Sequence, residues 1–152
     1  EHLPESLVRL SLARNEFSEE ISLMKLPTKL AAMVVSNNKL TGSISLEHLP
    51  DSLGILDLNT NAFLGTLCLT RLPPRMEILF LQRNGFCGPI DVTALPAKLL
   101  DIRLNSNAFS GIADFSTLPA SLETFSMSDN PDLEGTISMS AVYRRAFDMT
   151  NT

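Results

Sequence analysis

Hydrophobic and polar positions follow a 23-residue repeat along most of the chain. The dipeptide Leu-Pro marks each start, at residues 3–4, 26–27, 49–50, 72–73, 95–96 and 118–119. Each start is followed by the apolar spacing L-x-x-L-x-L, of which Leu53, Leu56 and Leu58 are one copy. The alternating part of this pattern predicts a short strand with its leucines pointing inward. Stacked copies would then form one parallel sheet with strands about 4.8 Å apart.

An asparagine follows each predicted strand, where the chain must turn. Its amide carries donors and an acceptor, so it can satisfy turn backbone groups in its own and the adjacent coil. We therefore predict a structural ladder of Asn15, Asn38, Asn61, Asn84, Asn107 and Asn130. A Phe or Leu two residues later would fill the inside of the turn, and a recurring Gly would supply a positive φ beyond it. The I-x-L pair that follows alternates again, which predicts a second short strand.

We predict one domain over residues 1–152. The predicted repeats are 3–25, 26–48, 49–71, 72–94, 95–117 and 118–141, followed by a cap or tail over 142–152. In the last repeat Leu133 stands three positions after Asn130 instead of two, and Gly135, Ile137 and Met139 are delayed with it. This delay indicates a one-residue insertion, which loops tolerate.

The two ends of the chain depart from the repeat. Glu1-His2 matches Glu47-His48, so we expect that the natural chain extends further at its N-terminus or that this is a processed piece. At the other end we predict a cap whose apolar helical face covers the last coil, with Arg144 and Arg145 facing water. That face would consist of Val142, Tyr143, Ala146 and Phe147.

The spacing L-x-x-L-x-L-x-x-N-x-F resembles the signature of leucine-rich-repeat (LRR) proteins. The fuller unit, LPxSLxxLxLxxNxFxGxIxLxx, resembles the 23-residue repeats of kinetoplastid (trypanosomatid) LRR proteins. Plant receptor-type repeats share the F-x-G-x-I phrase but usually continue with Pro. This chain instead has Ser22, Ser45, Cys68, Asp91, Asp114 and Ser138 there.

This resemblance implies an α/β-class LRR solenoid shaped as a horseshoe arc. The parallel β-sheet would form the concave face. The convex side would be mostly irregular, with possible second short strands and few helices. The family binds proteins or other ligands, often on the concave sheet, and it implies no catalytic residues.

Residues on the outward half of each predicted strand do not build the core, so their identities bear on function. Val34, Ile55, Ile78 and Phe80 fall on three consecutive strands and would form an apolar patch. Polar residues border it, namely Asp57, Gln82, Asp101 and Arg103. An aromatic anchor with a polar rim is typical of a protein-binding interface. The alternative is that these are scattered exposed apolar residues, which sheets favour for packing reasons.

The chemical groups of the chain indicate no catalytic, metal or cofactor site. Asp101 and Arg103 are two apart on one strand, which favours an ion pair. His2 and His48 would lie roughly 10 Å apart, too far to share a metal. Cys68 and Cys87 sit at unmatched positions of adjacent coils, so we expect two free thiols and no disulfide.

Composition narrows the possible partners. The chain has 152 residues, a net charge of −5 and scattered Lys and Arg, which argues against nucleic acid. No apolar run approaches the ~20 residues of a membrane span. The two cysteines and the absence of Asn-x-Ser/Thr sites favour a reducing compartment such as the cytoplasm, with the cell surface as the alternative. We expect a monomer.

Two functions fit these features, and a third does not. The first is a non-enzymatic protein-binding module that uses the concave face. The second is a structural or surface-display array, coat- or adhesin-like, without a dedicated ligand. Such a spacer should carry uniformly small polar residues on that face, whereas Ile, Phe, Asp and Arg occur there. The third, an enzyme, is not expected, because it would need clustered catalytic groups in a pocket and an open concave sheet supplies none.

Overall fold

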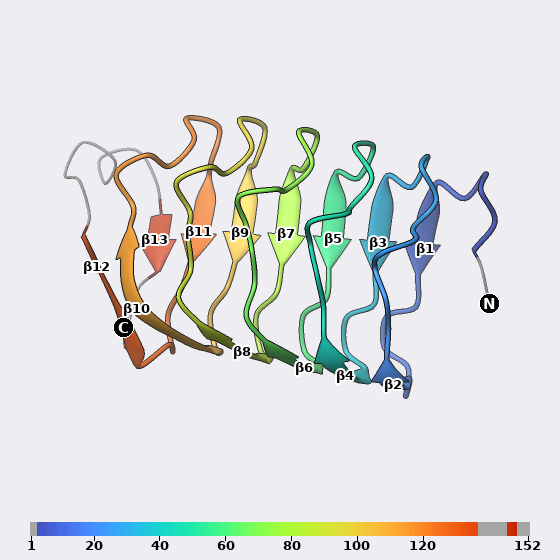
Figure 1. The fold of residues 1–152 in the computed structure, drawn as a ribbon, viewed down its shortest axis with the longest axis horizontal. Helices are drawn as coiled ribbons and strands as arrows, with labels where there is room; N and C mark the ends of the chain where they lie inside the picture. Colours follow the sequence, from blue (N-terminus) through green and yellow to red (C-terminus); the bar gives the residue numbers. More distant parts are fainter. Residues whose placement is uncertain (1–2, 137–145, 149–152) are drawn as a thin grey trace.

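The computed structural model describes residues 3–136 and 146–148 of the chain. Successive coils lie side by side along the long axis in sequence order (Figure 1). Each of the six coils contributes one strand to each of two parallel sheets, and one further strand joins the first sheet. The described residues contain no helix. The fold is therefore a parallel-sheet β-solenoid, as the repeat predicts.

The first strand of each coil belongs to a seven-stranded sheet. These strands are β1 (Arg9–Ser11), β3 (Ala32–Val34), β5 (Ile55–Asp57), β7 (Ile78–Phe80), β9 (Asp101–Arg103), β11 (Thr124–Ser126) and β13 (Ala146–Asp148). They pair in parallel in the order β1-β3-β5-β7-β9-β11-β13. From β1 to β11, residues at the same repeat position lie opposite one another, so each repeat position forms a straight column across the sheet.

The alternation of each strand explains which side chains build the core. The central residues Met33, Leu56, Leu79 and Ile102 are buried, while their neighbours in the strand are half-buried. A strand points successive side chains to opposite faces, so one residue in two faces the interior. Because burial is shared between neighbouring coils, stability is collective along the solenoid.

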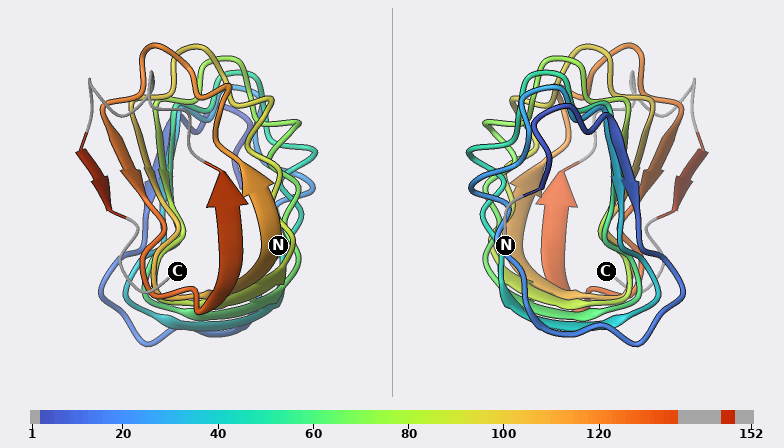
Figure 2. Two further views of the ribbon diagram at one scale, coloured as in Figure 1. Left: turned by 90° about the vertical axis from the view of Figure 1, so that its left-hand side faces the viewer. Right: turned by 90° about the vertical axis from the view of Figure 1, so that its right-hand side faces the viewer.

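A six-stranded sheet lines an adjoining side of the coils (Figure 2). Its strands are β2 (Ser18–Glu20), β4 (Lys39–Ser43), β6 (Ala62–Gly65), β8 (Gly85–Gly88), β10 (Ala108–Asp114) and β12 (Asp132–Thr136). These second strands cover the Phe-x-Gly phrase and not the later I-x-L pair, so their predicted position is wrong except where β10 extends to Asp114. The reason is that alternation predicts an extended backbone but not which segment pairs with the next coil. The strands β6 and β8 end at Gly65 and Gly88, whereas β4 and β10 continue past Gly42 and Gly111.

The register of this second sheet accommodates the inserted residue of the last repeat. Leu64 lies opposite Gly85 and Ala108 opposite Cys87, a step of 21 residues in both pairs. Gly111 lies opposite Leu133, a step of 22 residues. The insertion is therefore absorbed before β12, and Leu133 is still buried. Ile137 and Met139, which share the predicted delay, lie outside the described residues.

Phenylalanines form the interior beside the second sheet. The rings of Phe63 and Phe86 stack with centroids 6.1 Å apart, and those of Phe86 and Phe109 with centroids 6.5 Å apart. Phe115 meets Phe125 edge-on at 5.5 Å. The aromatic position two residues after Asn61, Asn84 and Asn107 thus forms a buried stack through three consecutive coils.

The C-terminal segment differs from the predicted helical cap. Residues 146–148 form strand β13, which pairs in parallel with β11 and places Phe147 opposite Phe125. A helix over Ala146 and Phe147 is therefore wrong, because the edge of the seven-stranded sheet offers backbone groups that a further strand can satisfy. Val142, Tyr143, Arg144 and Arg145 lie outside the described residues.

Candidate functional site

The residues predicted to bind a partner lie on the outer face of the seven-stranded sheet. We call Val34, Ile55, Ile78 and Phe80 the apolar patch. Val34, at the end of β3, lies opposite Asp57 on β5, which lies opposite Phe80 on β7. Ile55 lies opposite Ile78 in the neighbouring column. The four side chains are half-buried, so part of each remains available to a partner.

Arg103 is held on this face by two neighbours. Its Nε and Nη2 donate to the two carboxylate oxygens of Asp101 at 3.1 and 2.8 Å. Its Cζ lies 4.6 Å from the centroid of the Phe80 ring, within cation–π range. The hydrogen bond to Asp101 raises the pKa of Arg103 above its ordinary value. The predicted ion pair is confirmed, and it fixes the guanidinium against the aromatic member of the patch.

Asp57 lies within the patch without a cation. Its Oδ1 accepts the backbone N–H of Asn59 at 3.1 Å and the Asn59 side-chain amide. The ion pairs among the described residues are Lys39–Glu16, Arg71–Glu47 and Arg103–Asp101, so none of them includes Asp57. Asp57 therefore brings an unneutralised carboxylate to the outer face.

The sequence predicts that Gln82 borders the apolar patch with an accessible polar group, but its side-chain oxygen is not accessible. Its Oε1 is buried and accepts no hydrogen bond from the described part of the chain. A partner on the outer face could not reach a covered oxygen. Gln82 consequently contributes surface to the rim and not an available acceptor.

The asparagines join consecutive coils. In the middle of the chain, Asn84 Oδ1 accepts the backbone N–H of Phe63 at 3.1 Å. Its Nδ2 donates to the carbonyls of Leu58 and Leu81, also at 3.1 Å. The same pattern recurs at Asn38, Asn61, Asn107 and Asn130. Asn15, in the first coil, donates only to carbonyls of its own coil.

Other polar contacts between and within coils were missed by the sequence analysis. Ser52 Oγ donates to the carbonyls of Thr28 and Leu30 in the preceding coil, at 2.8 and 2.7 Å. Ser121 makes the equivalent bond to Leu99 at 2.7 Å. The serine of the Leu-Pro-x-Ser-Leu phrase was the available signal, because it recurs at a fixed repeat position.

The residue that follows the Ile position of the F-x-G-x-I phrase forms a local turn. Asp91 accepts from the hydroxyl and the backbone N–H of Thr93, and Asp114 accepts from Ser116. These hydrogen bonds lower the pKa of both carboxyls, the side-chain bonds contributing most. Ser22 and Ser45 accept the backbone N–H two residues later in the same way. The polar residues at this position thus have a structural role.

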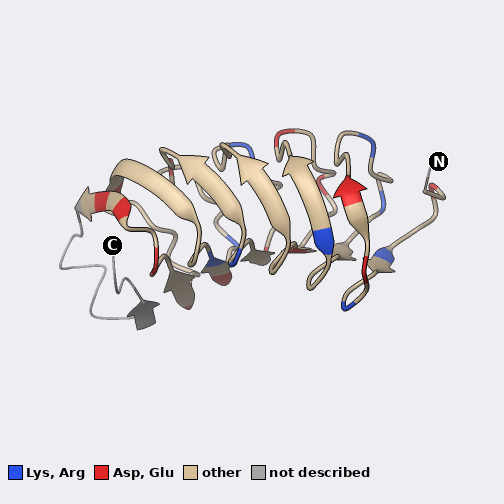
Figure 3. Cartoon of the chain, turned by 90° about the horizontal axis from the view of Figure 1, so that it is seen from below, with Lys and Arg blue, Asp and Glu red and all other residues tan. Residues whose placement is uncertain are grey.

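The outer face of the six-stranded sheet is a second apolar surface. Strands β6 and β8 carry no Asp, Glu, Lys or Arg, and β10 carries only Asp114 (Figure 3). Leu64 is 56% exposed and Ile112 is 77% exposed. These two residues are more exposed than the apolar patch, and charged residues border Ile112, because Glu134 lies opposite it on β12. The sequence analysis missed this face because it placed the second strand elsewhere.

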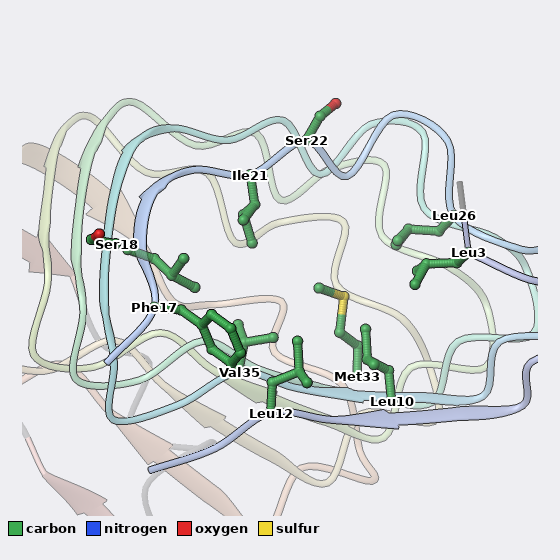
Figure 4. A pocket seen from close by; sticks show the side chains of 11 residues that line it. Leu3, Leu10, Leu12, Phe17, Ser18, Ile21, Ser22, Leu26, Met33 and Val35 are labelled. Carbon is green, nitrogen blue, oxygen red and sulfur yellow. The ribbon is translucent and has the colours of Figure 1, made fainter. Parts of the chain in front are cut away.

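A hollow of about 250 Å³ lies at the first coil (Figure 4). Its walls include Leu10, Leu12 and Phe17 of the first coil and Met33 and Val35 of the second. These are the inward-facing repeat positions that other coils bury. The hollow is therefore the open end of the apolar interior, and it does not have the convergent polar groups of a ligand site.

The described residues contain no group of three His, Cys, Asp or Glu side chains placed to hold a metal ion. His48 is exposed, and His2 lies outside the described residues. Cys68 and Cys87 are half-buried free thiols, and Cys68 Sγ lies 3.3 Å from the hydroxyl of Thr70. In the part of the chain described, no helix is long and apolar enough to cross a membrane.

The solenoid, its parallel sheets and its repeat define the fold of a leucine-rich-repeat protein. The LRR ectodomain of the receptor kinase SOBIR1 from Arabidopsis thaliana is a solved structure with a similar fold, with a TM-score of 0.61 and 28% sequence identity. The match covers 73% of this chain and 62% of the SOBIR1 chain. No protein-family model matches the sequence, and neither does any curated protein.

Proposed function

We propose that this protein is a non-enzymatic binding module whose ligand is another protein, held on the outer face of the seven-stranded sheet. The observation that carries the proposal is the apolar patch, because the orientation of its aromatic residue, Phe80, is fixed by a charged neighbour, Arg103. Phe80 is stacked against Arg103, which Asp101 fixes in turn. A pre-ordered aromatic side chain loses little conformational entropy on binding, which favours a role as an interface anchor.

The variation between coils supports binding over a structural or surface-display array. At the same column position the face changes from Val34 to Asp57 to Phe80 to Arg103, and then to the buried Ser126. The solenoid itself does not require this sequence of side chains, since the inward residues already supply the packing. An array without a ligand would have no use for alternating apolar and charged residues in the middle coils.

The 23-residue unit also supports a kinetoplastid-type repeat, since Ser, Cys68 or Asp stands where the plant unit usually has Pro. We expect the protein to be a monomer. The free thiols favour the cytoplasm over the cell surface as the site of action.

The test is a crosslinking pull-down from the source cell with two forms of the protein. The variant combines Phe80→Asp with Ile78→Ser, which changes the outer face and leaves the buried Leu79 intact. A matched control combines Leu64→Asp with Ile112→Ser on the other sheet. Partners captured by the wild type and the control but lost by the patch variant support the proposal. Undiminished capture by a correctly folded patch variant contradicts it.

A further inference from the structure

We infer that the partner presents a Lys or Arg side chain to Asp57, flanked by apolar side chains that cover the apolar patch. This inference rests on the proposed function and specifies the chemistry of its ligand. Its starting point is the position of Asp57, which lies between Val34 and Phe80 in one column and follows Ile55 closely on its own strand. A partner that covers these apolar side chains must also cover the carboxylate.

Covering Asp57 without compensation is unfavourable. Removing a carboxylate from water costs several kcal/mol unless an opposite charge or enough hydrogen bonds replace the water. Asp57 has the Asn59 contacts on Oδ1, but the described residues supply no ion pair to it. The partner must therefore provide a positive charge or hydrogen-bond donors to this carboxylate.

The other charges of the patch are already matched. Arg103 has both donor groups directed at the Asp101 carboxylate, so this pair is neutral as a unit. Asp57 then leaves the middle of the face with one net negative charge. Charge complementarity consequently favours a basic group over an acidic one.

Arg103 also shows how a cation can fit beside Phe80. Its guanidinium lies between a carboxylate and the Phe80 ring, at 4.6 Å from the ring centroid. Asp57 is opposite Phe80 on the neighbouring strand, about 4.8 Å away along the sheet. A partner cation at Asp57 would therefore have a carboxylate and the same aromatic residue nearby, which adds a cation–π contribution.

The experiment uses a phage-displayed library of random 12-residue peptides selected on the full chain. Counter-selection on the Phe80→Asp, Ile78→Ser variant removes peptides that bind elsewhere. We expect the retained peptides to be enriched in Lys or Arg next to aliphatic or aromatic residues. Affinities of the retained peptides are then measured for wild type, Asp57→Asn, Asp57→Glu and Asp114→Asn.

Asp57→Asn preserves an oxygen for the Asn59 hydrogen bonds and removes the charge. We expect it to weaken binding at least tenfold and to flatten the salt dependence of the affinity. Asp57→Glu should recover most of the affinity, while Asp114→Asn, which removes the same charge from the side away from this face, should change it less than twofold. Circular dichroism of each variant establishes that it is folded.

The outcomes separate the inference from the proposed function. Retained peptides that lack basic residues, or that bind Asp57→Asn as well as wild type, overturn the inference and leave the proposed function standing. A selection that yields only peptides bound equally by the Phe80→Asp, Ile78→Ser variant contradicts the proposed function as well.

Discussion

Glu19 and Gly42 occupy the same position of consecutive coils, and both have a positive φ, 85° and 81° respectively. In the next three coils this position is Gly65, Gly88 and Gly111, also with positive φ. Only glycine adopts this backbone without a steric penalty. The first coil therefore keeps the turn of its neighbours although its side chain is unsuited to it.

Replacing Glu19 with Gly should stabilise the protein. We expect the free energy of unfolding to rise by about 0.5–1 kcal/mol, because the relieved backbone strain exceeds the entropy that a glycine loses on folding. Urea denaturation measures the change. The opposite substitution, Gly65→Ala, should lower the free energy of unfolding by about 1–2 kcal/mol. Equal stability of Glu19→Gly and wild type would show that the turn is not strained.

Removing an interior ladder amide should destabilise the solenoid. Asn84→Ala leaves the Phe63 N–H and the Leu58 and Leu81 carbonyls without this partner. The two carbonyls keep their bonds from Asn61 and Asn107, so the Phe63 N–H is the group left unsatisfied. One such group costs about 1–3 kcal/mol, so we expect a loss of about 2–3 kcal/mol in urea denaturation. Asn15→Ala is the control, because Asn15 is exposed and bonds only within its own coil. It should cost about 1 kcal/mol, and a loss as large as that of Asn84→Ala would refute the role of the inter-coil bonds.

The carboxyl of Asp91 should titrate below its ordinary pKa. The Thr93 hydroxyl and backbone N–H favour the ionised form. A lowered folded-state pKa stabilises the fold above the unfolded pKa, and this stabilisation is lost as the pH falls through the folded pKa. Carbon-detected NMR titration should show the low pKa, and Thr93→Val should raise it toward the ordinary value. An unchanged pKa in Thr93→Val would mean that the hydroxyl is not responsible.

Both cysteines should react as free thiols in the folded, unreduced protein. Cys68 and Cys87 are half-buried and unbridged, so a thiol reagent should detect two equivalents. Cys68→Ser should leave one equivalent. Detection of none before reduction, and two after it, would reveal a disulfide that this arrangement does not contain.

The repeat positions that face inward could be predicted from the sequence because each has one physical requirement. Leu56 and Leu79 had to be buried, and the register of β5 and β7 follows from their equal spacing. The second sheet was harder to predict. Its position depends on which backbone segments of neighbouring coils pair, which a pattern of alternating residues does not encode.

For the candidate site, the sequence predicted only which residues are neighbours on the face of the sheet. The sequence placed Phe80 beside Asp57 and Arg103, and the strand register agrees. It could not show that the guanidinium of Arg103 stacks on Phe80 or that the Gln82 oxygen is covered. These features depend on side-chain rotamers and on neighbours in other coils, so they require the three-dimensional structure.

The most direct test of binding at the apolar patch is hydroxyl-radical footprinting of the protein, free and with its captured partner. Phe80 and Ile78 report on the outer face of the seven-stranded sheet, while Leu64 and Ile112 report on the other sheet. Binding at the apolar patch predicts that oxidation of Phe80 and Ile78 falls severalfold in the complex and that Leu64 and Ile112 react as before. Protection of Leu64 and Ile112 with unchanged Phe80 and Ile78 would contradict it.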